Sequence, residues 1–273
     1  MNKFKALTAA LALALGGGLA QAATLNTTTG LPGDGVIQFS GIDWHGNGTA
    51  LISGFNDAAM NNAGDTDTFT LTFQGFAGVI NGGSPTPNLR VGAPGPGVGG
   101  YELTTIAVLN ETATCVNAGC TIISVHTDSG SWNVWFDNSP DANQAAGTGF
   151  TDGTIILTGT FTGGDSVFNG SLGSGGGQVL GNVTVTNNAF VNPNLVTTTI
   201  QTSLNFPGTT NWTPSLLVNG VAVGVVTPDR FIVQADADQS FTQAVPEPAT
   251  LALAGLGLLG VALSRKRRNG VRA

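Results

Sequence analysis

Thr68-Phe69-Thr70-Leu71-Thr72-Phe73 is the stretch that decides the fold, because apolar and hydroxyl side chains alternate in it with a period of two. This period places the phenyl and leucyl side chains on one face of a β-strand and the threonines on the other. Shorter runs of the same kind recur along the chain, separated by clusters of glycine and asparagine that are typical of turns. They lie at Trp132-Val134-Phe136, Ile155 to Phe161, Val183-Val185, Ile200 to Phe206 and Phe231-Val233.

The composition points to the same class of fold. Only 9% of the residues are charged, whereas amphipathic helices need Glu, Lys and Arg on their solvated faces. The sequence therefore predicts an all-β protein with one antiparallel β-sandwich or barrel-like domain over residues 23–235. About 220 residues are enough for one such core.

Glycine- and proline-rich segments interrupt the predicted strands. Residues 81–100 contain four prolines among many glycines, which predicts an exposed loop within the domain. Residues 163–177 are rich in glycine and predict a flexible connection or hairpin tip. Residues 236–244 are interpreted as a stem that follows the domain.

The first 22 residues have the organisation of a secretory signal peptide. Lys3 and Lys5 precede an apolar segment from Ala6 to Leu15, and Ala20-Gln21-Ala22 forms an A-x-A cleavage site. The mature chain is expected to begin at Ala23.

The last part of the chain has three segments in a fixed order. The motif Val245-Pro246-Glu247-Pro248 is followed by an apolar run from Ala249 to Leu263 and by the basic cluster Arg265-Lys266-Arg267-Arg268. Fifteen helical residues reach roughly 22 Å, less than the ~30 Å of a hydrocarbon core. The positive charges would remain cytoplasmic, so the preceding domain would face outward. A permanent membrane anchor is the alternative interpretation.

Residues 245–268 resemble the PEP-CTERM sorting signal of Gram-negative bacteria that produce exopolysaccharide. The resemblance implies that an exosortase, a membrane-embedded protease, recognises the Pro-Glu-Pro motif during export. It further implies that the hydrophobic helix is inserted only transiently.

Without these two end segments the chain is strongly acidic. Between residues 23 and 244, Arg90 and Arg230 are the only basic residues against fifteen acids, a net charge of −13 with histidine neutral. Such a surface disfavours nucleic acids and anionic membranes, and it attracts divalent cations or cationic polymers.

Cys115 and Cys120 are the only cysteines. In an exported protein they are expected to form a disulfide around a four-residue loop. A metal site would need two further soft ligands nearby. A redox role is the remaining alternative, although C-x₄-C is not the usual C-x-x-C pattern.

Two groups of residues are candidates for catalysis or metal binding. Asp43 and His45 share one face of a strand, which favours a structural hydrogen bond over a catalytic dyad. Asp65 and Asp67 are weak candidates for a Ca²⁺ site, as is the D-x-D of Asp236 and Asp238, but neither pair has the spacing of an EF-hand. Solvated turn carboxylates are the favoured interpretation. No cofactor or catalytic residue is predicted.

Trp135 is the candidate for carbohydrate contact. It lies on the opposite face of its strand from Trp132 and Phe136, and an exposed indole stacks well on a sugar. A sheet that is buried on both faces is the alternative.

A second, shorter resemblance concerns the outer domain. Residues 132–143 and 147–159 are similar to segments of flocculation-associated PEP-CTERM proteins. This similarity implies a non-enzymatic, structural or adhesive protein of the cell surface or extracellular matrix, in contact with exopolysaccharide during floc or biofilm formation. The alternatives are a secreted polysaccharide-active hydrolase and a lectin-like binding module.

Overall fold

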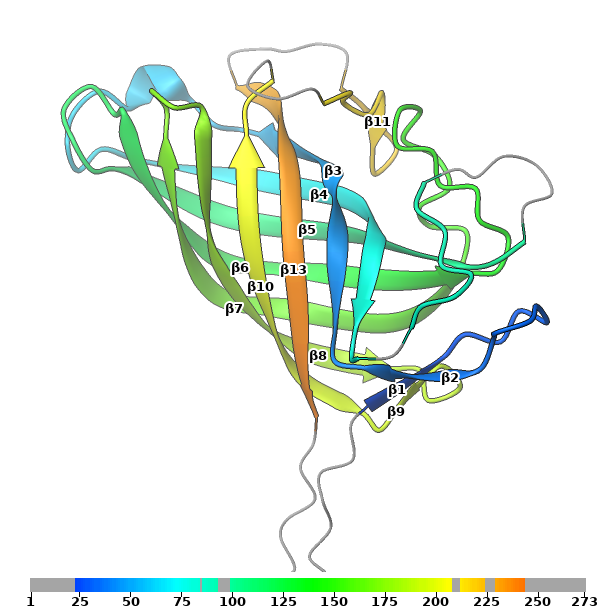
Figure 1. The fold of residues 1–273 in the computed structure, drawn as a ribbon. Coiled ribbons are helices and arrows are strands. Elements are labelled where there is room, and N and C mark those ends of the chain that lie inside the picture. Colours follow the sequence, from blue (N-terminus) through cyan, green and yellow to red (C-terminus); the bar gives the residue numbers. More distant parts are fainter. Residues whose placement is uncertain (1–22, 84, 93–98, 208–211, 224–228, 244–273) are drawn as a thin grey trace, which may run out of the picture. The chain divides into compact units, whose positions relative to one another are not determined.

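The computed structural model describes residues 23–83, 85–92, 99–207, 212–223 and 229–243. Eight antiparallel strands close into a barrel in the order β10-β13-β3-β4-β5-β6-β7-β8 (Figure 1). The prediction of an all-β domain is confirmed. Of the two predicted architectures, sandwich and barrel, the structure has the barrel. The barrel strands are β3 (Gly41–Ser53), β4 (Thr66–Asn81), β5 (Glu102–Cys115), β6 (Ile122–Asp137), β7 (Thr154–Asn169), β8 (Ser174–Thr186), β10 (Leu195–Asn205) and β13 (Arg230–Gln243).

The smaller elements lie outside this closed sheet. Strands β1 (Ala23–Asn26), β2 (Val36–Phe39) and β9 (Val191–Asn192) form a three-stranded sheet, and β11 (Leu217–Val218) pairs with β12 (Val221–Ala222). The described residues contain one short 3₁₀ helix, η1 (Asp57–Ala59). No helix in these residues is long and apolar enough to cross a lipid bilayer.

The alternation in β4 sets the inside and the outside of the barrel. Phe69, Leu71 and Phe73 are buried, and the threonines between them are partly exposed. Each strand of the barrel pairs with two neighbours, so no barrel strand is left with an open edge.

The prediction that residues 236–244 form a stem after the domain is wrong, because strand β13 runs through this segment to Gln243. Residues 236–243 continue the strand that closes the barrel, pairing with β10 on one side and with β3 on the other. The inner positions Ala235 and Ala237 are small, and the outer positions Asp236 and Asp238 are charged, so the segment lacks the large apolar residues that mark most strands. The β-domain therefore extends to Gln243.

The glycine-rich residues 163–177 are also more regular than predicted. Strands β7 and β8 run through most of this segment and leave only residues 170–173 for the turn. A Cβ on Gly177 would lie 2.2 Å from the backbone oxygen of Asp165, and a Cβ on Gly175 would lie 2.6 Å from the ring of Phe168. These glycines permit close packing between strands rather than flexibility.

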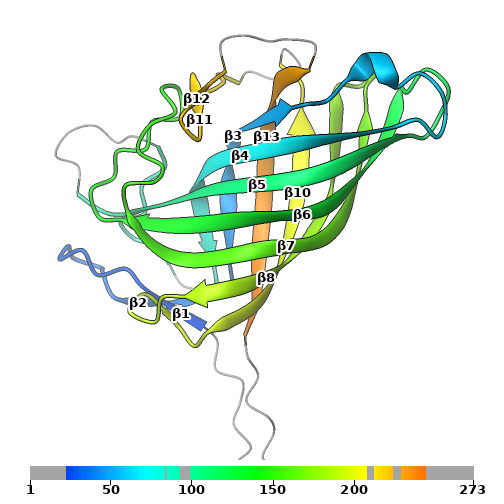
Figure 2. The same cartoon turned by 180° about the vertical axis from the view of Figure 1, so that it is seen from behind.

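Part of the outer surface of the barrel is covered by connecting segments. The segment between β6 and β7 is a long connection at one end of the barrel (Figure 2). It packs Ala142 and Phe150 against Phe76, Ile106 and Trp135. Near β11, the amide side chain of Gln74 donates to the backbone oxygen of Leu217 and accepts from the N–H of Asn219. One side of the barrel wall is therefore buried on both faces.

Candidate functional site

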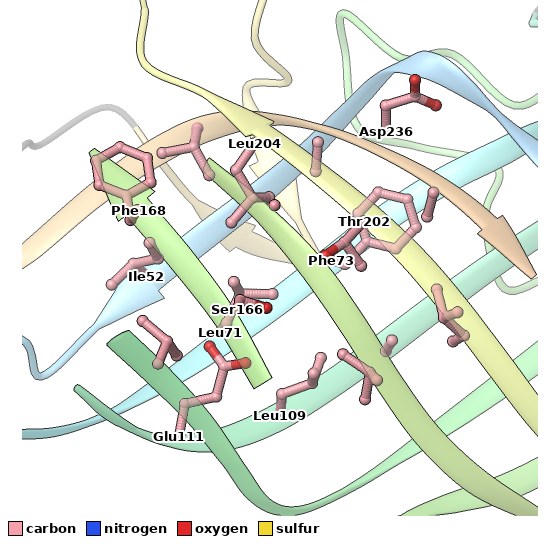
Figure 3. Close-up of a pocket in the computed structure, with 18 of the residues that line it drawn as sticks. Ile52, Leu71, Phe73, Leu109, Glu111, Ser166, Phe168, Thr202, Leu204 and Asp236 are labelled. Carbon is pink, nitrogen blue, oxygen red and sulfur yellow. The ribbon is translucent and has the colours of Figure 1, made fainter. Parts of the chain in front are cut away.

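The interior of the barrel holds a cavity of about 200 Å³. All eight barrel strands contribute to its lining, which is mainly apolar. Figure 3 shows Ile52, Leu71, Phe73, Leu109 and Leu204 among the residues around this space. Ligand sites in proteins are usually concave and mostly apolar, with a few polar groups.

Phenylalanine side chains gather at one end of the cavity, at the strand ends near the β7–β8 turn. Phe55 contacts Phe69 and Phe231 with ring centroids 5.7 and 6.0 Å apart, and Phe206 contacts Phe168 and Phe231 at 4.7 and 5.8 Å. All five line the cavity, and we call them the phenylalanine collar.

The opposite end of the barrel is filled by aromatic side chains that do not line the cavity. Tyr101 stacks on Phe136 with centroids 5.3 Å apart, and Phe39 packs on Phe241 at 5.4 Å. These four side chains are buried. The empty space is therefore displaced toward the phenylalanine collar.

Glu111 is a buried carboxyl side chain in the lining. It lies near Leu71, Leu109 and Ser166 in Figure 3, and its Oε1 accepts a hydrogen bond of 3.1 Å from the hydroxyl of Thr127. Burial raises its pKa to about 7, and the negative charge of Asp128 acts in the same direction. A substantial fraction of this carboxyl is protonated near neutral pH.

A second polar group lies among the lining residues. The indole N–H of Trp44 donates to Oε1 of Gln239 over 3.1 Å. Neither the side-chain nitrogen of Gln239 nor the indole nitrogen of Trp132 has an acceptor among the described residues. Both side chains are almost fully buried, where an unmet donor costs about 1–3 kcal/mol.

The structural hydrogen bond predicted between Asp43 and His45 is not found in the described structure. The Nδ1 atom of His45 accepts from the backbone N–H of Asn47, and the ring stacks on Phe76 with centroids 5.0 Å apart. The other histidine, His126, pairs with Asp165 at 2.8 Å on the exposed surface. Neither histidine lines the cavity.

The weak Ca²⁺ candidates hold turns. Oδ2 of Asp65 accepts from the backbone N–H groups of Asn61 and Asn62, and Oδ2 of Asp67 accepts from that of Asn56. These contacts are typical of turn carboxylates. Asp238 accepts from the side-chain amide of Asn81.

Another acidic group lies outside the barrel lining. In the described residues, Glu102, Asp137 and Asp141 place one oxygen each within 4.8 Å of one another. Glu102 is fully buried and already accepts backbone hydrogen bonds from Asp141 and Ala142 at 3.0 Å. Burial raises its pKa to about 7. The carboxyl thus attaches the β6–β7 connection to the start of β5.

The surroundings of Trp135 do not fit the prediction that its side chain contacts a sugar. It does lie on the opposite face from Trp132, but only 8% of its surface is exposed, because Ala142 and Phe150 cover it. An indole covered to this extent cannot present its face to a sugar. The prediction assumed that the outer face of the strand was open to solvent.

Cys115 and Cys120 form a disulfide. It closes a small loop, and the entropy model for loops of about six residues gives roughly 2 kcal/mol of stabilisation. We expect the double variant Cys115→Ser, Cys120→Ser to remain folded and to lose at most about this free energy of unfolding. Urea unfolding of both proteins measures it. A variant that no longer unfolds cooperatively would contradict this expectation.

Sequence reasoning missed both buried carboxyls, although a signal for one was present. Glu111 shares the inner face of β5 with Leu109 and Ala113, following the period of two. A charged residue within such an apolar row indicates an enclosed polar group. For Glu102 the sequence carried no comparable signal, because its burial comes from the distant β6–β7 connection.

The predicted processing residues lie largely outside the described residues. These are Ala20 and Ala22 of the signal peptide, Val245 to Pro248, and the basic cluster 265–268. Ala23 is described and begins β1.

Comparisons with known proteins bear on the C-terminal segment. The family model of the PEP-CTERM protein-sorting motif matches residues 244–268. No curated protein and no solved structure matches the chain.

Proposed function

We propose that this chain, which carries a PEP-CTERM sorting motif and is therefore an exported substrate of exosortase, is a non-enzymatic matrix protein. Its expected place is the cell surface or the extracellular matrix. There it would have a structural and adhesive role in exopolysaccharide-associated flocs or biofilms. The sorting motif is the observation that carries the proposal. In bacteria that use PEP-CTERM signals, export through exosortase accompanies exopolysaccharide production.

The exterior of the barrel suits contact with a hydrated polysaccharide. Its exposed positions carry hydroxyl and amide side chains that bond to one another across strands, such as Asn110 with Ser129 at 3.1 Å and Thr197 with Thr242 at 2.6 Å. Groups of this kind exchange hydrogen bonds with sugar hydroxyls directly or through water. The exported part has only two basic residues, so it repels an anionic polymer, and a neutral or cationic polymer is the favoured partner.

A secreted polysaccharide-active hydrolase is the second candidate. It is favoured by one observation, that the buried carboxyl side chain of Glu111 lies in the lining of the cavity. Glycosidases need two carboxyls that face one another, and the side chain of Asp236 is exposed on the outer face of β13. The mainly apolar lining favours the non-enzymatic role, because a sugar needs many hydrogen-bonding partners. The lectin-like alternative loses its support, since Trp135 is covered.

Deletion of the gene tests the matrix role. We expect the deletion strain to secrete a normal amount of polysaccharide but to form no flocs. Reintroduction of the wild-type gene should restore floc formation. Dispersed cells that secrete no polysaccharide would contradict the proposal. Shortening of the secreted polysaccharide by purified protein would support the hydrolase instead.

The mass of the mature protein tests the processing. We expect a chain that begins at Ala23 and lacks the apolar run and the basic cluster. Replacing Pro246, Glu247 and Pro248 by alanine should leave uncut precursor in the membrane fraction. Recovery of full-length polypeptide from wild-type cells that contain exosortase would contradict transient insertion.

A further inference from the structure

We propose that the barrel interior binds a neutral single-chain amphiphile, with its apolar chain among the residues of the phenylalanine collar and a carbonyl oxygen at the Glu111 carboxyl. This site is independent of the matrix role, which concerns the outer surface. The inference depends on the space in the barrel, the character of its lining and the position of its polar groups.

The size and lining of the cavity indicate an elongated apolar occupant. Its volume of about 200 Å³ corresponds to on the order of ten water-sized groups. Protein interiors rarely contain empty space on this scale, because it forfeits dispersion contacts. Apolar cavities of comparable size tend to stay dry and to bind apolar molecules.

Glu111 supplies the polar end of the site. Its Oε1 accepts from the hydroxyl of Thr127, and the side chain is buried in the lining of the cavity. The protonated carboxyl can donate one hydrogen bond to a carbonyl oxygen. Ser166 and Thr202 add hydroxyl groups to the same lining.

The charges around the site select a neutral ligand. The two arginines of the described chain, Arg90 and Arg230, do not line the cavity, whereas the buried Glu111 does. Asp128 of β6 also acts on Glu111. A ligand carboxylate would therefore be desolvated without a cation beside it. A cationic ligand would form a buried ion pair, whose desolvation cost often exceeds the attraction.

Competition for the neutral fluorophore N-phenyl-1-naphthylamine tests the site on the mature protein recovered from the extracellular fraction. The competitors are dodecane, 2-dodecanone and dodecanoate, which share a chain and differ in the polar end. We expect 2-dodecanone and dodecane to displace the fluorophore, and we expect dodecanoate at pH 8 to do so more weakly than 2-dodecanone. No displacement by either neutral ligand, or tighter binding of dodecanoate at pH 8, would overturn the proposal.

Two variants of Glu111 test the role of the carboxyl. Glu111→Leu should weaken 2-dodecanone about two- to tenfold, as expected for one lost hydrogen bond, without weakening dodecane. In the wild type, 2-dodecanone should bind more weakly at pH 8 than at pH 6. Glu111→Gln keeps an N–H donor at every pH, so its affinity should not change over this range. Equal loss of both ligands in Glu111→Leu would overturn the assignment of the carbonyl to Glu111.

Filling the cavity tests the location. Leu204→Trp and Val125→Phe enlarge two partly buried side chains of the lining, and each should reduce the binding of both neutral ligands at least tenfold. Val185→Phe places the same bulk at an exposed position of β8 outside the lining and is the matched control. Circular dichroism identifies a filling variant that fails to fold. The other filling variant then tests whether the ligand binds in the cavity. Undiminished binding in a folded filled variant would overturn the site.

Discussion

Substitution of Gly159 by valine is expected to prevent the barrel from folding, and substitution by alanine is expected to cost roughly 3 kcal/mol of the free energy of unfolding. Gly159 on β7 lies directly opposite Trp132 on β6. A Cβ at this position would lie 2.2 Å from two atoms of the indole ring and 2.4 Å from the backbone oxygen of Asn182. These distances are far below van der Waals contact, so a side chain requires the indole or the strand to move.

The surroundings of Trp132 leave the indole little room to move. Only 1% of its surface is exposed, and its ring packs against Phe241 with centroids 6.0 Å apart. Because a single domain has only about 5–15 kcal/mol of net stability, several kcal/mol at one position are enough to unfold it.

Urea unfolding followed by tryptophan fluorescence measures the effect of Gly159→Ala. The matched control is Gly78→Ala in β4, where the nearest atoms to a new Cβ lie at 3.6 Å; we expect it to change stability by less than about 1 kcal/mol. Gly159→Ala should cost less free energy of unfolding in a Trp132→Leu background than in the wild type, because the indole is one of the two groups in conflict with the new Cβ. Equal stability of Gly159→Ala and Gly78→Ala would show that the indole can move aside.

The same pair of residues shows what the sequence contained and what it did not. The alternation around Trp132 predicted the strand and the inward direction of its side chain, because this depends only on a period of two. The need for glycine at position 159 depends on which residue of the neighbouring strand lies opposite. Register of this kind is a tertiary property, and no local pattern in β7 specifies it.

Strand β13 illustrates a second limit. Closure into a barrel rather than a sandwich depends on the pairing of β13 with both β10 and β3. Its inner alanines and outer aspartates have low strand propensity, so the segment looked like a stem. The burial of Trp135 has the same origin, because the covering residues Ala142 and Phe150 belong to an irregular segment whose path the sequence does not reveal.

The second large effect is that the protein should become more stable as the pH falls from 8 to 5. Burial raises the pKa of Glu102 and of Glu111 from an ordinary value of 4.5 to about 7. Between these values the folded protein binds protons that the unfolded chain has lost. The free energy of unfolding therefore rises as the pH falls through 7 and levels off near 4.5. A shift of this size corresponds to roughly 3 kcal/mol for each carboxyl.

The other shifted groups do not reverse this trend in the same range. The hydrogen bond from the Thr29 hydroxyl, together with others from neighbouring groups, lowers the pKa of Asp34 to about 2. Backbone hydrogen bonds lower the pKa of Asp65. Both groups lose their stabilising effect only below about pH 4. The hydrogen bond with Asp165 raises the pKa of His126, so this exposed pair also favours the folded state at lower pH.

Glu111→Gln separates the contribution of the cavity from that of the outer wall. The amide is nearly isosteric and does not titrate, so we expect the difference in the free energy of unfolding between pH 8 and pH 5 to fall by roughly 3 kcal/mol. Asp57→Asn, at an exposed position of η1, is the control and should leave the pH dependence as it is. The remaining dependence in Glu111→Gln is assigned mainly to Glu102, whose oxygens hold the backbone of Asp141 and Ala142. A wild-type protein that loses stability steadily from pH 8 to pH 5 would show that these carboxyls ionise freely, which would also remove the hydrogen-bond donor from the proposed ligand site.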